Sequence, residues 1–230
     1  MALTAIRIAP SSQHHGHGGL PAAHWLPERT MTSLEASQQR WTYDQRTDGR
    51  IAVTLDSNVW NLLFEASVDL AAEFPIAQFA LFVPREGEIE ATAITKPELL
   101  EFIEEATRRA EVVTAAIVGF DTGERPQRMA PMGFGTFQSA KDAEIRAAMH
   151  RYLGNRQKGS GLYRNEGDMA VAVAAFSSIV ITAERPTKRG PLKFAFQRGG
   201  RIVYLQRDAC AAGRLQERVL ACHHEVANNI

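Results

Sequence analysis

The chain has 230 residues, of which 45% are hydrophobic and 23% charged, and its 26 basic and 26 acidic residues give a formal net charge of zero at pH 7. This length allows one large domain or a domain with an appendage, and the composition indicates a soluble globular protein with a buried core. No apolar run approaches the roughly 18 residues of a membrane-spanning helix, and the opening MALTAIRIAP is too short and too weakly apolar for a signal peptide. The spacing of Cys210 and Cys222 fits neither a disulfide framework nor a zinc knuckle. We therefore expect a cytoplasmic protein with reduced thiols and no membrane partner.

Charge is segregated along the chain although its total is zero. Acidic residues predominate between positions 86 and 105, and basic residues predominate between 185 and 218. A basic rim beside an acidic centre would suit phosphate binding near metal ions. Two solvated faces of opposite charge would give the same pattern without any ligand. The pattern therefore admits a nucleic-acid partner but does not require one.

Residues 1–48 form a polar segment that is rich in Ser, Gln, His, Gly, Pro and Thr and has no sustained periodicity. We expect a disordered or loosely attached N-terminal arm. Its HHGH cluster, His14, His15 and His17, suggests metal ligands, but no carboxylate or cysteine framework surrounds it. A polar tail that is rich in histidine is the preferred interpretation.

Strands and helices alternate from Ile51 onward. The β-branched segment 51–55 predicts a buried strand, and Ser57 or Asn58 can cap the helix that follows. A second helix is predicted over 66–73, where the Phe-Pro pair ends it.

The next elements surround the acidic part of the chain. A strand is predicted at 79–83, and Pro84 suits the first position of the helix that carries the acidic residues. An amphipathic helix covers 97–111, and an extended segment follows at 112–120. The segment 121–139 has no period and is long for a simple connection, which favours a functional or mobile loop.

The second half of the chain repeats the alternation. Helices are predicted at 141–153, where Ser139 provides a cap, at the small-residue segment 169–176, at 190–196 and at about 212–227. Short strands are predicted at 179–182 and 201–205.

This order of elements implies a mainly parallel sheet covered on both faces, because parallel strands need helical crossovers. We predict an α/β three-layer sandwich with helices on both faces of the central sheet. The domain would span 49–210, with an insertion at about 111–160 and a C-terminal helix within 211–230.

Four carboxylates are predicted to meet at one edge of this sheet, namely Asp56, Glu90, Asp168 and Glu184. Asp56 and Glu184 follow predicted strands, and the carboxyl ends of parallel strands lie at the same edge. The other two lie near the starts of helices that begin at that edge. Asp56 could instead be a simple helix cap.

Two of these carboxylates have competitors nearby in the sequence. Glu90 competes with Glu86 and Glu88, any of which could complement the helix dipole. Asp168 competes with Glu166 and with a simple capping role. Spacing favours Glu90, and Asp168 is preferred over its alternatives.

A cluster of four carboxylates needs a source of positive charge. Two like charges about 4 Å apart repel by on the order of 4 kcal/mol at an effective dielectric of about 20. Divalent cations or bound protons relieve such repulsion. Oxygen ligands without histidine or cysteine favour Mg²⁺ or Mn²⁺ over zinc, and metals held in this way are typical of phosphodiester cleavage.

Three segments resemble the motifs of PIN-domain ribonucleases. LDSN at 55–58 resembles the hydrophobic-Asp-(Ser/Thr)-Asn opening of that family. FVPREGEIEA at 82–91 resembles its second motif and places the family's glutamate on Glu90. NEGDMAVAVAAF at 165–176 resembles the helix that opens with the third acidic residue, which falls on Asp168.

A fourth segment, VITAE at 180–184, resembles the family's closing strand with Thr-x-Asp. Glu184 replaces the aspartate there and lengthens the arm by a methylene. The resemblance covers about 51–205 in order, and the insertion at 111–160 is longer than in the compact toxin members of the family.

The resemblance implies a PIN-like fold and a metal-dependent endoribonuclease, with Mg²⁺ or Mn²⁺ held by the four carboxylates. It makes Thr182 a candidate ligand to metal-bound water or phosphate and makes Asn58 a positioner of Asp56. The basic residues expected to hold the RNA backbone are Arg185, Lys188, Arg189 and Lys193. The expected partners are RNA, a small inhibitory antitoxin protein and a second copy of the chain.

Two other functions remain open from the sequence. The chain could be a catalytically inactive PIN scaffold that binds RNA or protein, or a metal-dependent phosphohydrolase of small substrates. Four aromatic residues could stack on bases where they are exposed, namely Trp60, Phe134, Phe137 and Tyr163. Core packing is the preferred interpretation for Trp60.

Overall fold

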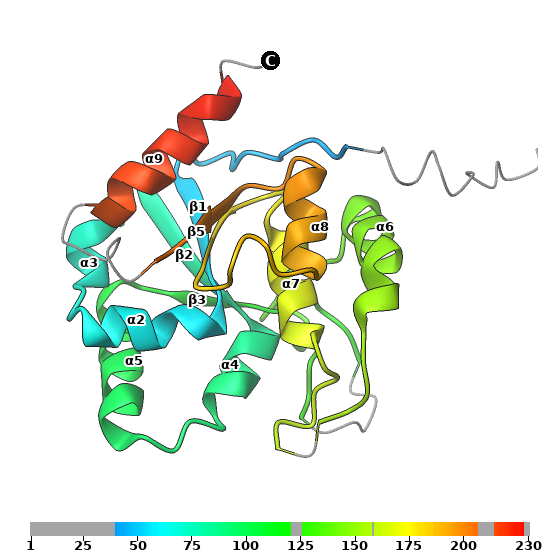
Figure 1. The fold of residues 1–230 in the computed structure, drawn as a ribbon, viewed down its shortest axis with the longest axis horizontal. Coiled ribbons are helices and arrows are strands. Elements are labelled where there is room, and N and C mark those ends of the chain that lie inside the picture. Colours follow the sequence, from blue (N-terminus) through cyan, green and yellow to red (C-terminus); the bar gives the residue numbers. More distant parts are fainter. Residues whose placement is uncertain (1–39, 121–125, 158, 207–213, 228–230) are drawn as a thin grey trace, which may run out of the picture.

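The computed structural model describes residues 40–120, 126–157, 159–206 and 214–227. At its centre lies a five-stranded parallel sheet with the order β3-β2-β1-β4-β5 (Figure 1). The strands are β1 (Ile51–Leu55), β2 (Phe79–Pro84), β3 (Val113–Ala115), β4 (Ile179–Thr182) and β5 (Ile202–Tyr204). The predicted α/β sandwich with a parallel central sheet is confirmed.

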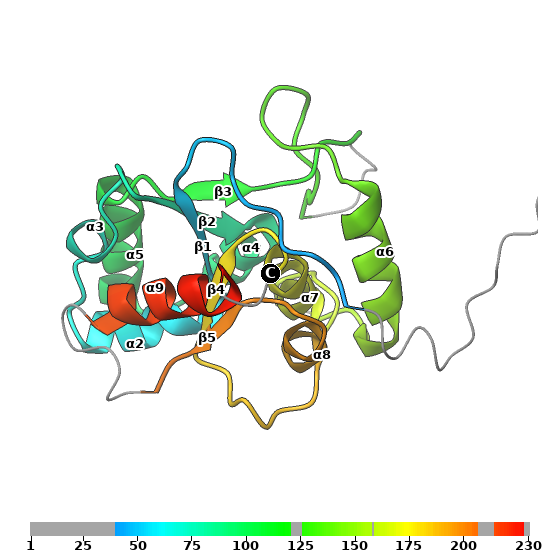
Figure 2. The same cartoon turned by 90° about the horizontal axis from the view of Figure 1, so that it is seen from above.

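Helices cover both faces of the sheet, which makes three layers (Figure 2). They are η1 (Ser57–Val59), α2 (Trp60–Glu65), α3 (Leu70–Glu73), α4 (Arg85–Ala91), α5 (Pro97–Arg109), α6 (Ala140–Met149), η2 (His150–Tyr152), α7 (Glu166–Ala174), α8 (Pro191–Gln197) and α9 (Arg214–Ala227). Figure 2 shows α2, α3, α5 and α9 on one side of the strands, and α6, α7 and α8 on the other.

Each face of the sheet has its own hydrophobic core. The first contains Val53, Leu63, Phe79, Ile181 and Val219. The second contains Ile145, Val171, Phe176, Val180 and Leu192. All four residues of β4 are buried, as expected for a parallel strand with helices on both sides. The sheet is therefore a rigid support for the residues at its carboxyl edge.

The end of the expected N-terminal arm packs against the domain. Trp41 is buried in the second core, where its ring centroid lies 5.5 Å from that of Phe176 and 6.2 Å from that of Phe194. The backbone N–H of Asp44 donates to the carbonyl of Phe176 at 2.8 Å. Residues 40–48 thus belong to the folded unit, whereas 1–39, with the histidine cluster, lie outside the described residues.

The insertion continues the sheet region and then adds a helix. Backbone bridges join Ile117 to Thr136 and Val118 to Ala130. Ser139 and Asp142 form a capping box that starts α6, and α6 packs against α7 through Ile145 and Met149 in the second core. The insertion is thereby attached to the helix that carries Asp168.

The helix predicted over 66–73 is wrong in its first turn, because α3 begins only at Leu70. Ser67 has a φ of 50°, which ends the preceding helix, and Asp69 caps α3 by accepting from the N–H groups of Ala71 and Ala72. Cys222 is half-buried in α9, and Cys210 lies outside the described residues. In the parts of the chain that the structure describes, no helix has the length and apolar character to cross a bilayer.

Candidate active site

Four carboxylates approach the carboxyl edge of the sheet from four different elements. Asp56 directly follows β1, Glu90 lies in α4, Asp168 lies in the first turn of α7, and Glu184 comes shortly after β4. Burial raises the pKa of Asp56 to about 7; the hydrogen bond from Thr182 opposes that rise, and the charges of Asp168, Glu90 and Glu184 add to it. The predicted residues are therefore close enough to act on one another electrostatically.

Asp56 occupies the N-cap position of η1, but its side chain makes no capping hydrogen bond there. Instead its Oδ2 accepts a hydrogen bond from Thr182 Oγ1 at 2.7 Å, and the residue is only 2% exposed. A carboxylate this deeply buried between two strand ends has no evident role in stabilising the helix, which supports a functional interpretation.

Thr182 and Asn58 lock the ends of β1 and β4 together. Thr182 Oγ1 accepts from Asn58 Nδ2 at 3.3 Å and from the Glu184 N–H at 3.0 Å, besides donating to Asp56. Asn58 Oδ1 accepts from the Ala183 N–H at 2.7 Å. Because a hydroxyl has one proton and two lone pairs, the Thr182 hydroxyl is saturated. Thr182 therefore positions Asp56 in this structure, and Asn58 acts through Thr182 and Ala183.

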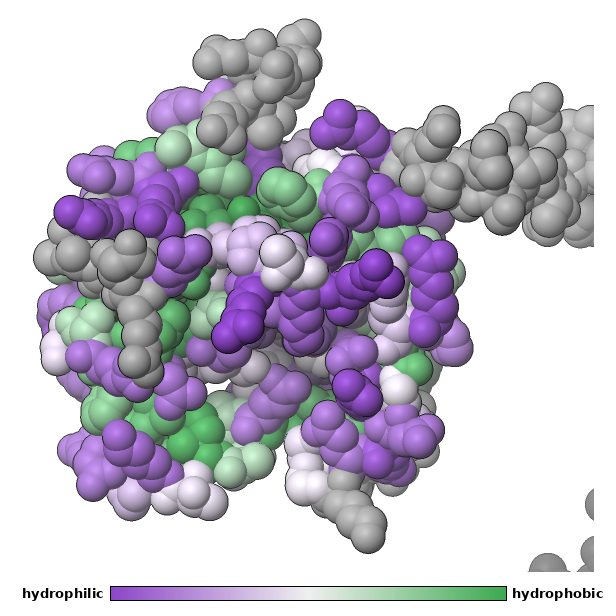
Figure 3. Space-filling model, viewed as in Figure 1, coloured by the Kyte–Doolittle hydropathy of each residue, from purple (hydrophilic) through white to green (hydrophobic). Residues whose placement is uncertain are grey.

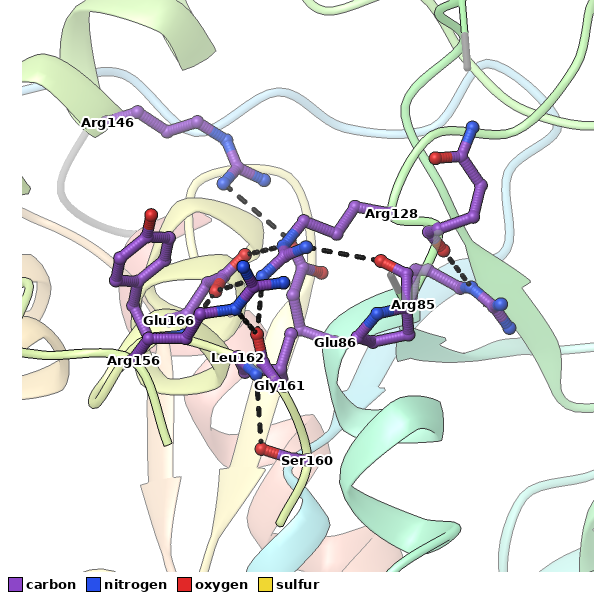
Figure 4. A network of polar contacts seen from close by, with 12 residues as sticks. Arg85, Glu86, Arg128, Arg146, Arg156, Ser160, Gly161, Leu162 and Glu166 are labelled. Atoms are coloured by element: carbon purple, nitrogen blue, oxygen red, sulfur yellow. Dashed lines mark hydrogen bonds and ion pairs between the residues drawn. The ribbon is translucent and has the colours of Figure 1, made fainter. Parts of the chain in front are cut away.

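The glutamates of α4 point to different partners, and this separates Glu90 from its competitors. Glu88 is paired with Arg85. Glu86 lies 3.9 Å from Arg146, and Figure 4 shows both of these residues. Glu90 Oε2 accepts a hydrogen bond from Ser57 Oγ beside Asp56. Burial raises the pKa of Glu90, the hydrogen bond from Ser57 opposes this, and the charge of Asp168 adds to it. The spacing-based choice of Glu90 agrees with these contacts.

Glu166 and Asp168 also have separate surroundings. Glu166 forms an ion pair with Arg128 of the insertion and accepts from the Tyr163 N–H at 2.6 Å (Figure 4). Arg128 also donates to the carbonyl of Gly161 at 3.0 Å, so the pair ties the insertion to the start of α7. Glu166 thus has a structural role, because it holds the insertion against the start of α7. Asp168 instead faces Glu184 and Lys188.

Gly167 is a site residue that the sequence did not single out. A Cβ built at this position would lie 2.7 Å from Glu90 Oε1. The glycine therefore allows Glu90 to approach the first turn of α7 next to Asp168. A glycine between two acidic residues at a helix start could have indicated this close approach.

Lys188 was predicted from the sequence to hold the RNA backbone. In the structure it lies among the four carboxylates. Its ammonium forms an ion pair with Glu184 and lies 3.5 Å from Asp168 Oδ2. Burial works to lower the pKa of Lys188, but the hydrogen bond to Glu184 and the charges of Asp168 and Glu184 outweigh it and raise the pKa. One positive charge thus already faces these two carboxylates.

The loop from 183 to 190 carries two more of the predicted basic residues and stands out from the sheet (Figure 2). Arg185 and Arg189 are exposed, and Lys193 is half-buried at the start of α8. None of the three forms an ion pair with a described residue. Figure 3 shows hydrophilic side chains gathered over the middle of the face that this loop crosses in Figure 1.

The aromatic candidates divide into two groups. Trp60 is 3% exposed and belongs to the core, as preferred from the sequence. Phe134 and Phe137 are more than three-quarters exposed, at 78% and 76%. Tyr163 is half-buried beside Arg128. Of the four candidates, Phe134 and Phe137 are the ones exposed enough to stack on a base.

The donor set has the chemistry of a hard-cation site, because it consists of carboxylate oxygens without histidine or cysteine. As the side chains stand, no three His, Cys, Asp or Glu residues of the described segments form a group that could hold a metal ion. Asp168 and Glu184 instead share Lys188. Closer convergence of the carboxylates would require Lys188 to move or a cation to offset their repulsion.

Comparisons with known proteins identify no relative. No protein-family model matches the chain, and neither a curated protein nor a solved structure matches it.

Proposed function

We propose that this protein is a metal-dependent endoribonuclease with a PIN-like active site. The observation that carries the proposal is the convergence of Asp56, Glu90, Asp168 and Glu184 on one edge of the sheet, with the buried Asp56 carrying a pKa raised to about 7. Clusters of like charges destabilise the folded protein because the charges repel one another, and such clusters are typical of catalytic sites.

The four carboxylates would hold Mg²⁺ or Mn²⁺. When bound, the metal would supply an activated water and neutralise charge on a phosphate. Thr182 and Asn58 keep Asp56 in place, and Ser57 and Gly167 do the same for Glu90. The exposed Arg185 and Arg189 would hold phosphates of an RNA strand, and Phe134 and Phe137 would contact its bases.

The decisive experiment is cleavage of an end-labelled mixed RNA with Mg²⁺, with Mn²⁺ and with chelator. We expect metal-dependent cleavage that both Asp56→Asn and Glu90→Gln abolish. Glu88→Gln is the matched control, because it removes one carboxylate from the same helix, and among the described residues Arg85 is the ion-pair partner of Glu88. Cleavage that persists in chelator or in the Asp56→Asn protein would contradict the proposal.

A second function is an inactive scaffold that binds RNA or a protein. The ion pairs of Lys188 with Glu184 and Asp168 favour it, since a cleft that supplies its own counter-charge has less need of a metal. RNA binding that is equal with and without metal, in a protein that cleaves nothing, would identify this function. A metal-dependent phosphohydrolase of small substrates is less favoured, because the exposed loop and aromatic residues suit a longer ligand.

A further inference from the structure

A groove with a volume of about 940 Å³ lies beside β5, the strand at one end of the sheet. Its walls come from residues 40–43, from the segment around β5 and from α9. Three arginines line it, Arg40, Arg201 and Arg218, and none of the described residues that line it is acidic. A groove of this size is large enough for a nucleotide-sized ligand.

Arg201 is the unusual member of this set, because it is only 4% exposed and has no carboxylate within ion-pair distance among the described residues. A buried cation is normally paired with an anion, since its desolvation is otherwise uncompensated. In the same segment as the groove wall, the acidic Asp44 pairs with Lys141 instead. The groove thus contains a buried positive charge whose counter-ion the described chain does not provide.

The contacts of the Arg201 guanidinium leave hydrogen-bond donors unused. Its carbon lies 3.4 Å from the centroid of the Tyr43 ring. Burial raises the pKa of the Tyr43 hydroxyl, and a hydrogen bond from Arg201 works to lower it. Nη1 contacts His223 Nδ1 at 3.4 Å, and Nε is buried without a partner. Burial and the charges of Arg201 and His224 lower the pKa of His223, which favours the neutral imidazole as the acceptor. The N–H groups in the plane of a guanidinium are the part that binds oxyanions.

The groove also has an aromatic wall. Phe196 is 54% exposed, and its ring packs edge-on against Tyr204 with the centroids 5.9 Å apart. Arg218 Nη1 reaches the Tyr204 carbonyl at 3.5 Å, and Arg40 is an exposed residue of the same lining. Positive and aromatic surfaces therefore lie next to each other.

We propose that this groove binds a nucleotide-sized phosphate monoester, with the arginines around the phosphate and Phe196 and Tyr204 against the base. The ligand could be a free mononucleotide or the phosphorylated end of an oligonucleotide, which share this chemistry. The proposal does not depend on the nuclease function, because the arginines that carry it include none of the residues assigned to the acidic site.

The test is calorimetric titration of the whole protein, in chelator, with AMP, adenosine, inorganic phosphate, and an oligonucleotide with and without a 5′-phosphate. We expect AMP to bind at least about tenfold more tightly than adenosine or phosphate alone. Tighter binding of the 5′-phosphorylated oligonucleotide than of AMP would support the proposal and identify a nucleic-acid end as the source. Absence of AMP binding at millimolar concentration, or equal affinity for inorganic phosphate, would overturn it.

Substitutions of the groove arginines test whether AMP binds in the groove beside β5. Arg40→Ala and Arg218→Ala change exposed side chains, so both proteins should fold, and each should weaken AMP binding at least about threefold. Arg108→Ala on α5 is the matched control, with the same loss of charge at a side chain that is 71% exposed. Asp56→Asn should bind AMP as the wild type does. Loss of binding in Asp56→Asn, or an equal loss in Arg108→Ala, would overturn the assignment to this groove.

Discussion

The hydroxyl of Thr182 donates its one proton to the buried carboxylate of Asp56 at 2.7 Å, across the ends of two neighbouring strands. This bond opposes the effect of burial on the pKa of Asp56. The pKa of Asp56 therefore depends on the hydroxyl of Thr182 at the end of β4 as well as on the burial of Asp56 itself.

Thr182→Val should raise the pKa of Asp56 further and lower stability by about 1–3 kcal/mol, because Asn58 and the Glu184 N–H also lose their acceptor. Carbon-detected NMR of the Asp56 carboxyl group and chemical denaturation measure the two effects. Thr54→Val is the matched control, since Thr54 is buried and bonded to Ser178 away from the carboxylates. An Asp56 pKa that moves equally in both variants would contradict a specific role for Thr182.

Without divalent metal, stability should fall as pH rises from about 4 to 7. The pKa of Asp56 is about 7 in the folded protein against 3.8 as its ordinary value, so the folded state binds more protons in this interval. The contribution approaches about 4 kcal/mol as an upper bound. Raised pKa values of Glu86, Glu90 and Glu184 act in the same direction.

Asp56→Asn should remove much of this dependence and make the protein more stable than the wild type above pH 7. Urea denaturation at pH 5 and pH 8 measures the change, with Glu88→Gln as a control that retains the dependence. A wild-type protein that is more stable at pH 8 than at pH 5 would show that Asp56 is not buried as described.

Gly167→Ala should reduce RNA cleavage by at least about tenfold, because the added methyl group would displace Glu90. Folding should be little affected or slightly improved, since alanine is favoured over glycine in a helix by about 1 kcal/mol. Gly159→Ala, at a position with open space around the added carbon, is the control. Cleavage and thermal melting of both variants separate a local effect from unfolding, and full activity of Gly167→Ala would exclude the close approach.

Lys188→Met should tighten binding of Mn²⁺ about fivefold, because Asp168 and Glu184 would no longer share their charge with the ammonium. It should also weaken RNA binding. Lys193→Met provides a control from α8, where the lysine forms no ion pair with a described residue. Manganese titration measures the first effect, and an unchanged or weaker affinity would show that Lys188 does not compete with the metal.

The sequence predicted most of the fold because strong periodicity and short connections constrain the topology. The segments 51–55 and 179–182 contain apolar, β-branched residues that only a buried parallel strand accommodates well. Once these strands are parallel, Asp56 and Glu184 must approach the same edge. The electrostatic coupling of the four carboxylates follows from this topology.

Other features depend on contacts between distant segments, which a local pattern does not reveal. Trp41 lies in an aperiodic segment, so its burial against Phe176 and Phe194 could not be predicted. The ion pair between Glu166 and Arg128 could be predicted only if the path of the insertion were known. From the sequence, Arg201 would be expected on the surface with the other cations of its basic segment. In the structure it is buried.

The order β3-β2-β1-β4-β5 places β1 and β4 next to each other at the centre of the site. The helices that carry Glu90 and Asp168, α4 and α7, lie between these two strands in the sequence. No contiguous fragment shorter than about seven-tenths of the described chain contains all four carboxylates. A nascent chain therefore has no complete acidic site until the segment through Glu184 has been made and β4 has paired with β1. Any activity of this site depends on that long-range pairing, so an incomplete chain that ends before β4 would lack it.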